Sequence, residues 1–308
     1  MDLGLTEIQQ MLKTSAQDFL SRECPLTLVR EMEEDPRGFT DELWRQMINL
    51  GWTGVAFPEQ YGGTGGNFAD LGVLLEEIGR SLAPAPFFST VVLGGMTVLD
   101  AGSDAQKNDL ISRICAGTII MTMAVPEAAA AYEPWDIQAT ASQQGGGYEI
   151  TGSKLFVPDA EAADVIIVAA RTSSGQDPAD GVSLFLVPSG TAGLTITPMW
   201  SVGNEKVFEV SLDKVNVTAD SALGAVGEAW PIIERSIQRA TAAQSIQMLG
   251  GAEAVLDMTV EYAKGRTQFG RAIGTFQAVQ HHCARMATDV EGSKGVAFQA
   301  VWRLSEGL

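Results

Sequence analysis

One arginine in the last third of the chain stands in a sequence that suits phosphate binding. Arg266 follows a long run of helical character, Gly270 and Gly274 interrupt that run, and Phe276-Gln277 opens the next one. A guanidinium beside the free backbone N–H groups of a helix start is suited to binding a pyrophosphate. Gln277, in the first turn, is placed to bind the polar edge of a heterocycle or a ribose. On the residues alone, the alternative is an ordinary helical hairpin in which the arginine caps carbonyl groups.

Other side chains with catalytic potential are few. His281 and His282 are adjacent on a predicted helix, so at most one of them faces a core, and we interpret both as structural or exposed. Glu76 and Glu77 are interpreted as a solvated helix face with one partly buried carboxylate. The sequence contains no GxSxG, HExxH or GxxxxGK motif, so these hydrolase, metalloprotease and P-loop signatures are absent. We expect no metal site.

Composition excludes several classes of partner. The chain has 308 residues, 45% hydrophobic and 19% charged, which suits folded domains with sizeable cores. Lys and Arg number 20 and Asp and Glu 38, for a net charge of −18. Nucleic acid and anionic membranes need a basic face, so neither is expected as the main partner. The three cysteines, Cys24, Cys115 and Cys283, are far apart, which favours a reducing compartment. With no secretory signal in view, a cytoplasmic location is expected.

The predicted secondary structure changes twice along the chain, from helices to strands and back to helices. We predict an N-terminal helical domain over residues 1–117, a middle β domain over 118–225 and a C-terminal helical domain over 226–308. Short β-branched runs between turn residues predict an antiparallel β-sandwich or barrel in the middle domain. These runs are 148–152, 164–170, 182–187, 194–197 and 207–212. Two helices do not close a bundle alone, so we expect the C-terminal domain to be incomplete, or its apolar faces to be covered by another chain or by the N-terminal helices.

The segment from Arg266 to Gln277 resembles the R-x-x-F-G-x-x-I-x-x-F-Q signature of the acyl-CoA dehydrogenases, a family of flavoproteins with the same helix–sheet–helix order. Four further segments resemble family motifs in the same order: the P-E-x-Y-G-G-x-G loop, the E-E-I-G helix, the Y-x-I-x-G-x-K hairpin and the L-G-x-x-G turn. They are Phe57–Gly66, Leu75–Arg80, Tyr148–Lys154 and Leu223–Gly227. The resemblance therefore covers nearly the whole chain and implies an α+β, acyl-CoA dehydrogenase-like fold.

The resemblance also implies a reaction and a cofactor. Such enzymes use FAD to remove hydrogen across the α,β bond of an acyl-CoA thioester in fatty acid or steroid degradation, and they pass the electrons to an electron-transfer flavoprotein. In the family's tetramers, the signature segment reaches the pyrophosphate and adenosine of a flavin that lies largely in a neighbouring subunit. Carried over residue by residue, this implies cofactor-binding roles for Arg266, Gln268, Phe269, Ile273, Phe276 and Gln277.

Three departures from the family pattern concern the other half of the flavin site. Val125 stands where the family has a threonine that contacts the isoalloxazine, and Pro158 replaces the threonine of the W-I-T-x motif, whose aromatic position is Phe156. Ala240 stands where one subgroup has its catalytic glutamate, and the commoner location of that base would lie beyond Leu308. The catalytic residue is therefore unassigned.

These departures favour a non-catalytic subunit, of the type found in α2β2 steroid-CoA dehydrogenases. In that interpretation the chain supplies the adenosine side of the flavin and is inactive alone. Two alternatives stay open: a homo-oligomeric dehydrogenase whose base lies outside these residues, and an assembly or scaffold subunit that keeps the fold and binds no flavin.

Overall fold

The computed structural model describes residues 4–129 and 132–308, which fall into two compact units. The first, which we call the helical unit, consists of the described parts of Met1–Arg30 together with Gly66–Ala83 and Thr241–Leu308. The second, the sheet unit, consists of Glu31–Gly65 and the described parts of Pro84–Ala240. The chain therefore passes between the units at four places, one of them inside the long helix α8 (Trp230–Gly265).

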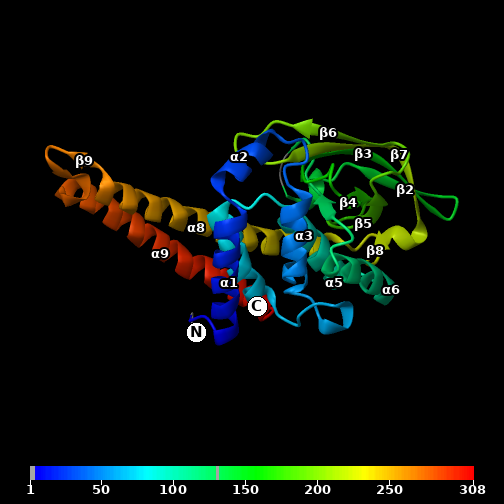
Figure 1. Ribbon diagram of the computed structural model, residues 1–308. Helices are drawn as coiled ribbons and strands as arrows, with labels where there is room; N and C mark the ends of the chain where they lie inside the picture. Colours follow the sequence, from blue (N-terminus) through cyan, green and yellow to red (C-terminus); the bar gives the residue numbers. More distant parts are fainter. Residues whose placement is uncertain (1–3, 130–131) are drawn as a thin grey trace. The chain divides into compact units, whose positions relative to one another are not determined.

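The helical unit is built almost entirely from long helices (Figure 1). They are α1 (Glu7–Glu23), the start of α2 (Leu26–Glu34), α4 (Phe68–Ser81), the second part of α8 (Trp230–Gly265) and α9 (Gln277–Ser305). Thr6 and Gln9 form a capping box at the start of α1. Asn67 and Asp70 form another at the start of α4. Such caps satisfy backbone amides that have no partner within the helix.

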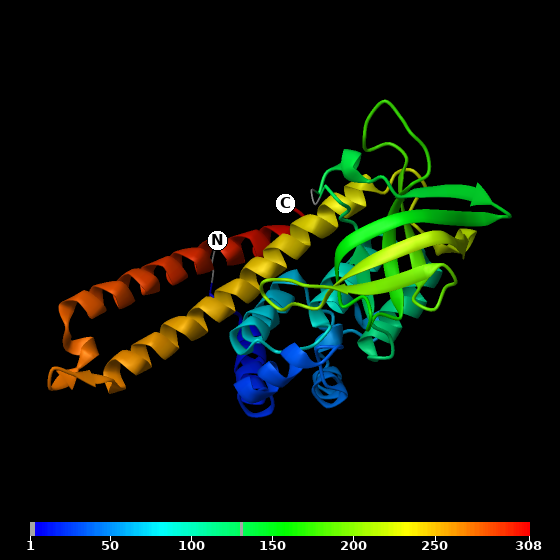
Figure 2. The same ribbon diagram turned by 90° about the horizontal axis from the view of Figure 1, so that it is seen from above.

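A short β-hairpin joins the ends of α8 and α9, which run side by side (Figures 1 and 2). Strand β9 (Thr267–Gln268) pairs antiparallel with β10 (Arg271–Ala272), and a 3₁₀ turn, η7 (Ile273–Thr275), leads into α9. The turn residues Phe269 and Gly270 have φ angles of 51° and 75°. Two positive φ angles suit the twist of a two-residue hairpin loop. The predicted interruption between two helices is confirmed, and it is an ordered hairpin.

The sheet unit carries short helices and helical turns before and between its strands. The regular α-helices are α3 (Asp41–Asn49), α5 (Met96–Ala101), α6 (Asp104–Gln106) and α7 (Ser112–Cys115). The turns are η1 (Trp52–Gly54), η2 (Glu59–Tyr61), the π-helical segments η3 (Phe88–Gly95) and η4 (Lys107–Ile111), η5 (Pro134–Asp136) and η6 (Ala219–Ser221). Thr40 caps the start of α3, and Gly51, at a φ of 75°, follows its C-cap residue Leu50.

Eight strands form one sheet in this unit. They are β1 (Met121–Ala124), β2 (Thr140–Gln144), β3 (Gly147–Pro158), β4 (Val165–Arg171), β5 (Val182–Pro188), β6 (Leu194–Met199), β7 (Val207–Thr218) and β8 (Ala222–Leu223). The order is β6-β7-β3-β2-β4-β5-β8, with β1 paired to β4. The predicted sequence of helices, strands and helices is confirmed. The predicted antiparallel pairing holds for most neighbouring strands, and the exceptions are at β4, which pairs parallel with β1 and with the start of β2.

A hydrophobic core lies against this sheet. Its larger members are fully or almost fully buried: Ile150, Val157, Ile166, Val168, Phe185, Val187, Phe208, Val210, Leu212 and Val215. They come from β3, β4, β5 and β7, so side chains of four strands share one interior. Burial of this apolar surface is the main term that stabilises the unit.

The interpretation of Glu76 and Glu77 as a largely solvated helix face is wrong. Both are buried, with 0% and 2% of their surface exposed. Helix α4 lies between α1 on one side and α9 on another, so little of it faces solvent. Lys13 from α1 and Lys294 from α9 supply the positive charges that make this burial tolerable.

Candidate cofactor-binding site

Arg266 lies at the outer end of the hairpin formed by α8 and α9. Its backbone N–H donates to the carbonyl of Tyr262 at 2.8 Å, and its own carbonyl accepts from the N–H of Ile273 at 2.8 Å. These bonds fix the backbone at the point where the long helix ends. The side chain is exposed, and within residues 4–129 and 132–308 its guanidinium has no hydrogen-bond or ion-pair partner.

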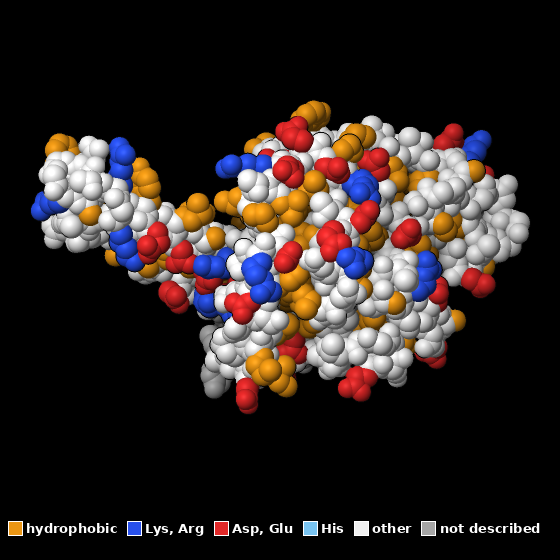
Figure 3. Space-filling view, in the orientation of Figure 1, with side chains coloured by type: hydrophobic (Ala, Val, Ile, Leu, Met, Phe, Trp, Pro, Cys, Tyr) orange, Lys and Arg blue, Asp and Glu red, His pale blue; other side chains and the backbone are white. Residues whose placement is uncertain are grey.

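The other predicted cofactor residues lie on the same short stretch. Gln268 and Gln277 are exposed, Phe269 is 92% exposed, and Ile273 and Phe276 are half-buried. The rings of Phe269 and Phe276 meet edge to face, with centroids 6.1 Å apart. Figure 3 shows Lys and Arg side chains beside hydrophobic ones at this end of the hairpin. The structure thus brings the six predicted residues onto one loop.

The chemistry of this tip suits an anionic, partly aromatic ligand. Helix α9 begins without a side-chain cap, because its N-cap residue is Phe276, so amides of its first turn remain available. Arg266 adds a delocalised charge with several donors, and Gln277 adds an amide. Arg271 is engaged differently: its guanidinium carbon lies 4.2 Å from the centroid of the Phe276 ring. The residues present therefore fit the pyrophosphate side of a dinucleotide.

The residues at the positions expected to contact the isoalloxazine ring of a flavin fit that group less well. Val125 is buried and offers no side-chain donor. Phe156 is 45% exposed, has a φ of 54°, and donates its backbone N–H to the sulfur of Met199. Pro158 ends β3 and has no backbone N–H. Only the aromatic ring of Phe156 remains available for stacking on a planar group.

A buried ion pair holds the backbone near Val125. Lys154 is fully buried, and its Nζ lies 2.6 Å from Oε1 of Glu127 and 3.3 Å from the carbonyl of Val125. Glu127 also accepts from the backbone N–H groups of Gln138 and Ala139, each at 3.0 Å. One carboxylate therefore joins β3 to both ends of the segment between β1 and β2.

Asp159 forms a second polar contact directly after β3. Its Oδ2 lies 2.5 Å from the hydroxyl of Ser89 in η3, and that hydroxyl also lies 3.1 Å from the carbonyl of Pro86. Ser89 has one proton and two acceptors, so a protonated Asp159 completes the hydrogen bonding. Burial raises the pKa of Asp159 from 3.8 to about 6, although the hydrogen bond from Ser89 opposes the shift.

Asp159→Asn is therefore expected to stabilise the protein above pH 6. Between pH 4 and 6 the folded state binds this proton more tightly than the unfolded state, so wild-type stability falls as the pH rises. The variant lacks this loss, and asparagine accepts the φ of 52° at this position. At about 1.4 kcal/mol per pKa unit, a gain of about 1–3 kcal/mol at pH 8 is expected, falling towards zero at pH 4.

Urea unfolding of both proteins across this pH range measures the difference. Asp213→Asn is the matched control, because Asp213 is exposed, and its stability should stay within about 0.5 kcal/mol of wild type at every pH. A gain in Asp159→Asn that is the same at pH 4 and pH 8 would contradict the assignment of the shifted proton.

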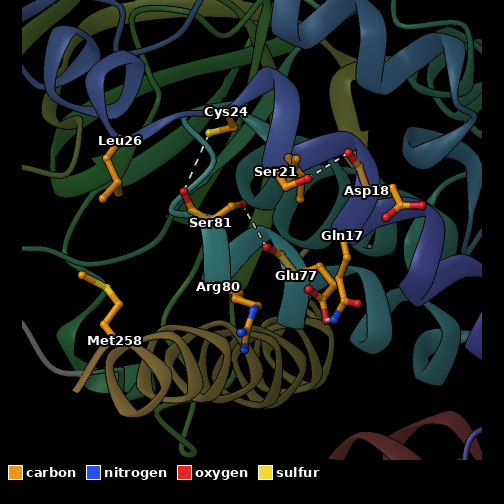
Figure 4. Close-up of a pocket in the computed structure, with 10 residues that line it drawn as sticks. Gln17, Asp18, Ser21, Cys24, Leu26, Glu77, Arg80, Ser81 and Met258 are labelled. Carbon is orange, nitrogen blue, oxygen red and sulfur yellow. Dashed lines mark hydrogen bonds between the residues drawn. The ribbon is translucent and has the colours of Figure 1, made fainter. Parts of the chain in front are cut away.

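A cavity of about 500 Å³ lies in the helical unit (Figure 4). Leu26 and Met258 lie on one side of it, and Gln17 and Glu77 lie on the other. Two of its three charged side chains are already paired: Arg80 with Glu253 and Asp257, and Glu77 with Lys13 and Gln17. We therefore assign no chemistry to this cavity.

No catalytic base is assigned. Ala240 is half-buried on α8, and Glu234 is exposed. Glu253 and Asp257 pair with Arg80. His281 and His282 are both exposed. No group of three or more His, Cys, Asp or Glu side chains that would suit a metal ion occurs in the described residues.

Sequence reasoning missed three groups beside Val125 and Pro158 in the sheet unit: Glu127, Lys154 and Asp159. Lys154 lies within β3 and Glu127 follows β1, and nothing in the sequence around either residue indicates that the two pair. Asp159 stands at the variable last position of the W-I-T-x motif, which carries no signal of burial. Their pairing depends on strand order, which the sequence did not determine.

Comparison with known proteins covers almost the whole chain. Three families match in order: "Acyl-CoA dehydrogenase, N-terminal domain" over residues 6–118, its middle domain over 122–215 and its C-terminal domain over 227–308. "Acyl-CoA dehydrogenase FadE27" of Mycobacterium tuberculosis is 31% identical over 306 residues, which cover 99% of this chain and 78% of that protein.

Two solved structures are similar throughout. Butyryl-CoA dehydrogenase from Megasphaera elsdenii has a TM-score of 0.91 and 29% identity, with 100% of this chain and 82% of that chain covered. A chain of the ChsE4-ChsE5 complex from Mycobacterium tuberculosis has a TM-score of 0.89 and 30% identity, with 99% and 80% covered. No helix in the described residues has the length and apolar character needed to span a bilayer.

Proposed function

The chain belongs to the acyl-CoA dehydrogenase family, FAD-dependent oxidoreductases that act on CH–CH bonds, and on this premise we propose that it works as one subunit of a hetero-oligomer. In this proposal it supplies the adenosine and pyrophosphate side of a flavin site that it shares with a homologous subunit. The substrate class is an acyl-CoA thioester, and the bulky esters of steroid side chains are the candidates within it. The subunit is inactive alone.

The observation that carries the proposal is the contrast between the two halves of the expected site. The tip of the hairpin presents Arg266 without a described partner, beside an uncapped helix start. The positions expected to contact the flavin ring have lost their side-chain donors, with Val125 buried and Pro158 at a strand end. A chain that has only the residues for the adenosine and pyrophosphate side suits a partner that has the residues for the flavin ring.

Each proposed site residue has a role that its chemistry allows. Arg266 binds the pyrophosphate, with Gln268 and Gln277 as neutral donors at the same tip. Phe269, Ile273 and Phe276 supply apolar surface around the adenosine. When bound, FAD supplies the acceptor for the hydride that leaves the β-carbon of the thioester. The residues described here orient the cofactor, and the base belongs to the partner in this proposal.

The proposed partners and location follow from the same premise. Similar chains occur in the ChsE4-ChsE5 complex and in the Tcur3481-Tcur3483 steroid ACAD, which supports a mixed tetramer. An electron-transfer flavoprotein is the proposed electron acceptor. We place the protein in the cytoplasm, where its free thiols Cys24, Cys115 and Cys283 would stay reduced. We retain three domains, over residues 1–117, 118–225 and 226–308, as part of the proposal.

Reconstitution with a homologous subunit tests the proposal. The chain purified alone and supplied with FAD is expected to stay colourless after desalting. After assembly with a homologous subunit that keeps the ring-side motifs, it is expected to retain flavin and to dehydrogenate an acyl-CoA with a dye as acceptor. Flavin retained by the chain alone would favour a homo-oligomeric dehydrogenase. An assembled complex without flavin would favour a scaffold subunit.

A further inference from the structure

Two adjacent buried glutamates in α4 have no part in the proposed flavin site. Oε2 of Glu76 lies 2.5 Å from Nζ of Lys13 in α1, and Oε1 lies 3.1 Å from Nζ of Lys294 in α9. Glu77 lies 3.4 Å from the same Lys13. Lys294 also lies 2.8 Å from Glu253 in α8. The carboxylate of Glu76 and its two lysines therefore link α1, α4, α8 and α9.

Helices α4 and α8 cross close to these ion pairs, and close contact between their backbones makes the crossing rigid. A Cβ on Gly79 of α4 would lie 2.1 Å from the carbonyl oxygen of Gln247, and a Cβ on Gly250 of α8 would lie 1.9 Å from that of Glu76. Both distances are shorter than any real contact, so α4 and α8 meet backbone to backbone. A Cβ on Gly72 would lie 3.0 Å from Val301, which is fully buried in α9. Closely packed helices move together, so the position of α4 at this crossing determines the positions of α8 and α9.

The charges at this crossing are strongly coupled. Although desolvation lowers the pKa of Lys294, its hydrogen bond to Glu253 and the charge of Glu76 raise that pKa above its usual value. Desolvation raises the pKa of Glu77, against the charge of Lys13. A buried charge that loses its partner costs several kcal/mol, so these groups hold one arrangement.

The outer part of the hairpin has no comparable support. Among the described residues of α9, only Ala297 and Val301 are buried, and both lie near its C-terminal end. On α8 the exposed side chains include Val255, Met258 and Tyr262. From Lys294 to Gln277 the helix rises about 25 Å at 1.5 Å per residue. A small rotation at the crossing therefore becomes a large displacement at the tip.

We propose that Glu76, through Lys294 and Lys13, is a positioning residue that sets the direction of the α8–α9 hairpin and so the place of Arg266 at its tip. The purpose assigned to this placement, presenting the tip to a flavin, rests on the proposed function. The positioning itself depends only on the ion pairs and close contacts within the helical unit. Glu76 thus has a role at a site that it does not touch.

A distance measurement tests the positioning directly. Nitroxide labels are attached through ketone-bearing residues at Met11 in α1 and Ala278 in α9, which leaves the native cysteines in place; both positions are exposed. Pulsed electron resonance on the full chain is expected to give one narrow distance in the wild type. Lys294→Met and Glu76→Gln are expected to lose the single narrow distance, because the charge that pins α9 to α4 is gone.

Matched variants separate this from a general loss of charge. Lys264→Met removes a lysine from an exposed pair with Glu261 on the same hairpin and should keep the narrow distance. Lys294→Arg keeps the cation and should restore it. Glu76→Gln is nearly isosteric and keeps the measurement possible where Lys294→Met does not fold. A wild-type distance in folded Glu76→Gln would overturn the proposal, whether or not the protein binds flavin.

Discussion

Arg266→Ala is expected to lower the flavin affinity of the assembled protein by about ten- to a hundredfold. A charge-assisted hydrogen bond to a phosphate contributes about 1.5–3 kcal/mol, and about 1.4 kcal/mol corresponds to a factor of ten. The exposed guanidinium has no partner among the described residues, so its removal leaves no buried charge unpaired. The folded structure should therefore survive, and the loss should appear as a lower ratio of flavin to protein after dialysis.

Arg271→Ala provides the matched control for this result. Arg271 lies on the same loop, is also exposed and stacks on Phe276, so its removal takes away an equal charge without the proposed phosphate contact. Its flavin content should stay near that of the wild type. Arg266→Lys should recover part of the affinity, because lysine keeps the charge and loses the bidentate geometry. Unchanged flavin content in Arg266→Ala would instead support the scaffold alternative.

The tip of the hairpin was predictable from sequence because its signals are local. Two helical patterns, two glycines and a phenylalanine-glutamine pair determine where α8 ends and α9 begins, and the structure places all six predicted residues there. Their role in binding a cofactor stays a prediction. The capping box of Thr6 and the end of α3 at Gly51 were predictable for the same reason, since each depends on neighbours along the chain.

The buried charges were not predictable, because their partners are distant in sequence. Glu76 pairs with Lys13, which lies 63 residues before it, and Lys154 pairs with Glu127, which lies 27 residues before it. A pair of glutamates on a helix is ordinarily exposed, and only the packing of α1 and α9 on both sides of α4 reverses that expectation. Sequence patterns report hydrophobic periodicity, and they do not report which charges meet.

Three short strands, β1, β2 and β8, were missed for a different reason. All four residues of β1 are buried, so it shows no alternation; β2 buries one residue of five, and β8 has two residues. Without alternation, a short apolar run does not distinguish strand from helix. The missed strands β1 and β2 are also the two that pair parallel with β4, so the exceptions to the predicted antiparallel pairing lie where the sequence carries no strand signal.

Glu127→Ala is expected to destabilise the protein by about 3–5 kcal/mol, the cost of breaking a buried ion pair by removing one partner. Lys154 would keep only the carbonyl of Val125, and the N–H groups of Gln138 and Ala139 would lose their acceptor. Chemical denaturation at pH 7 measures the loss. Glu133→Ala, which removes an exposed carboxylate from the same segment, should change stability by less than about 0.5 kcal/mol.

The pH dependence of this variant distinguishes a lost ion pair from lost packing. Desolvation already lowers the pKa of Lys154, and Glu127 is the group that opposes the shift. Without Glu127 the folded state binds that proton more weakly still, while the unfolded state keeps it, so stability should rise with pH. The defect should therefore shrink towards alkaline pH. A second change, Lys154→Met, should remove that slope and recover part of the stability, because both buried charges are then absent. A defect of constant size at every pH would show that the ion pair is not its cause.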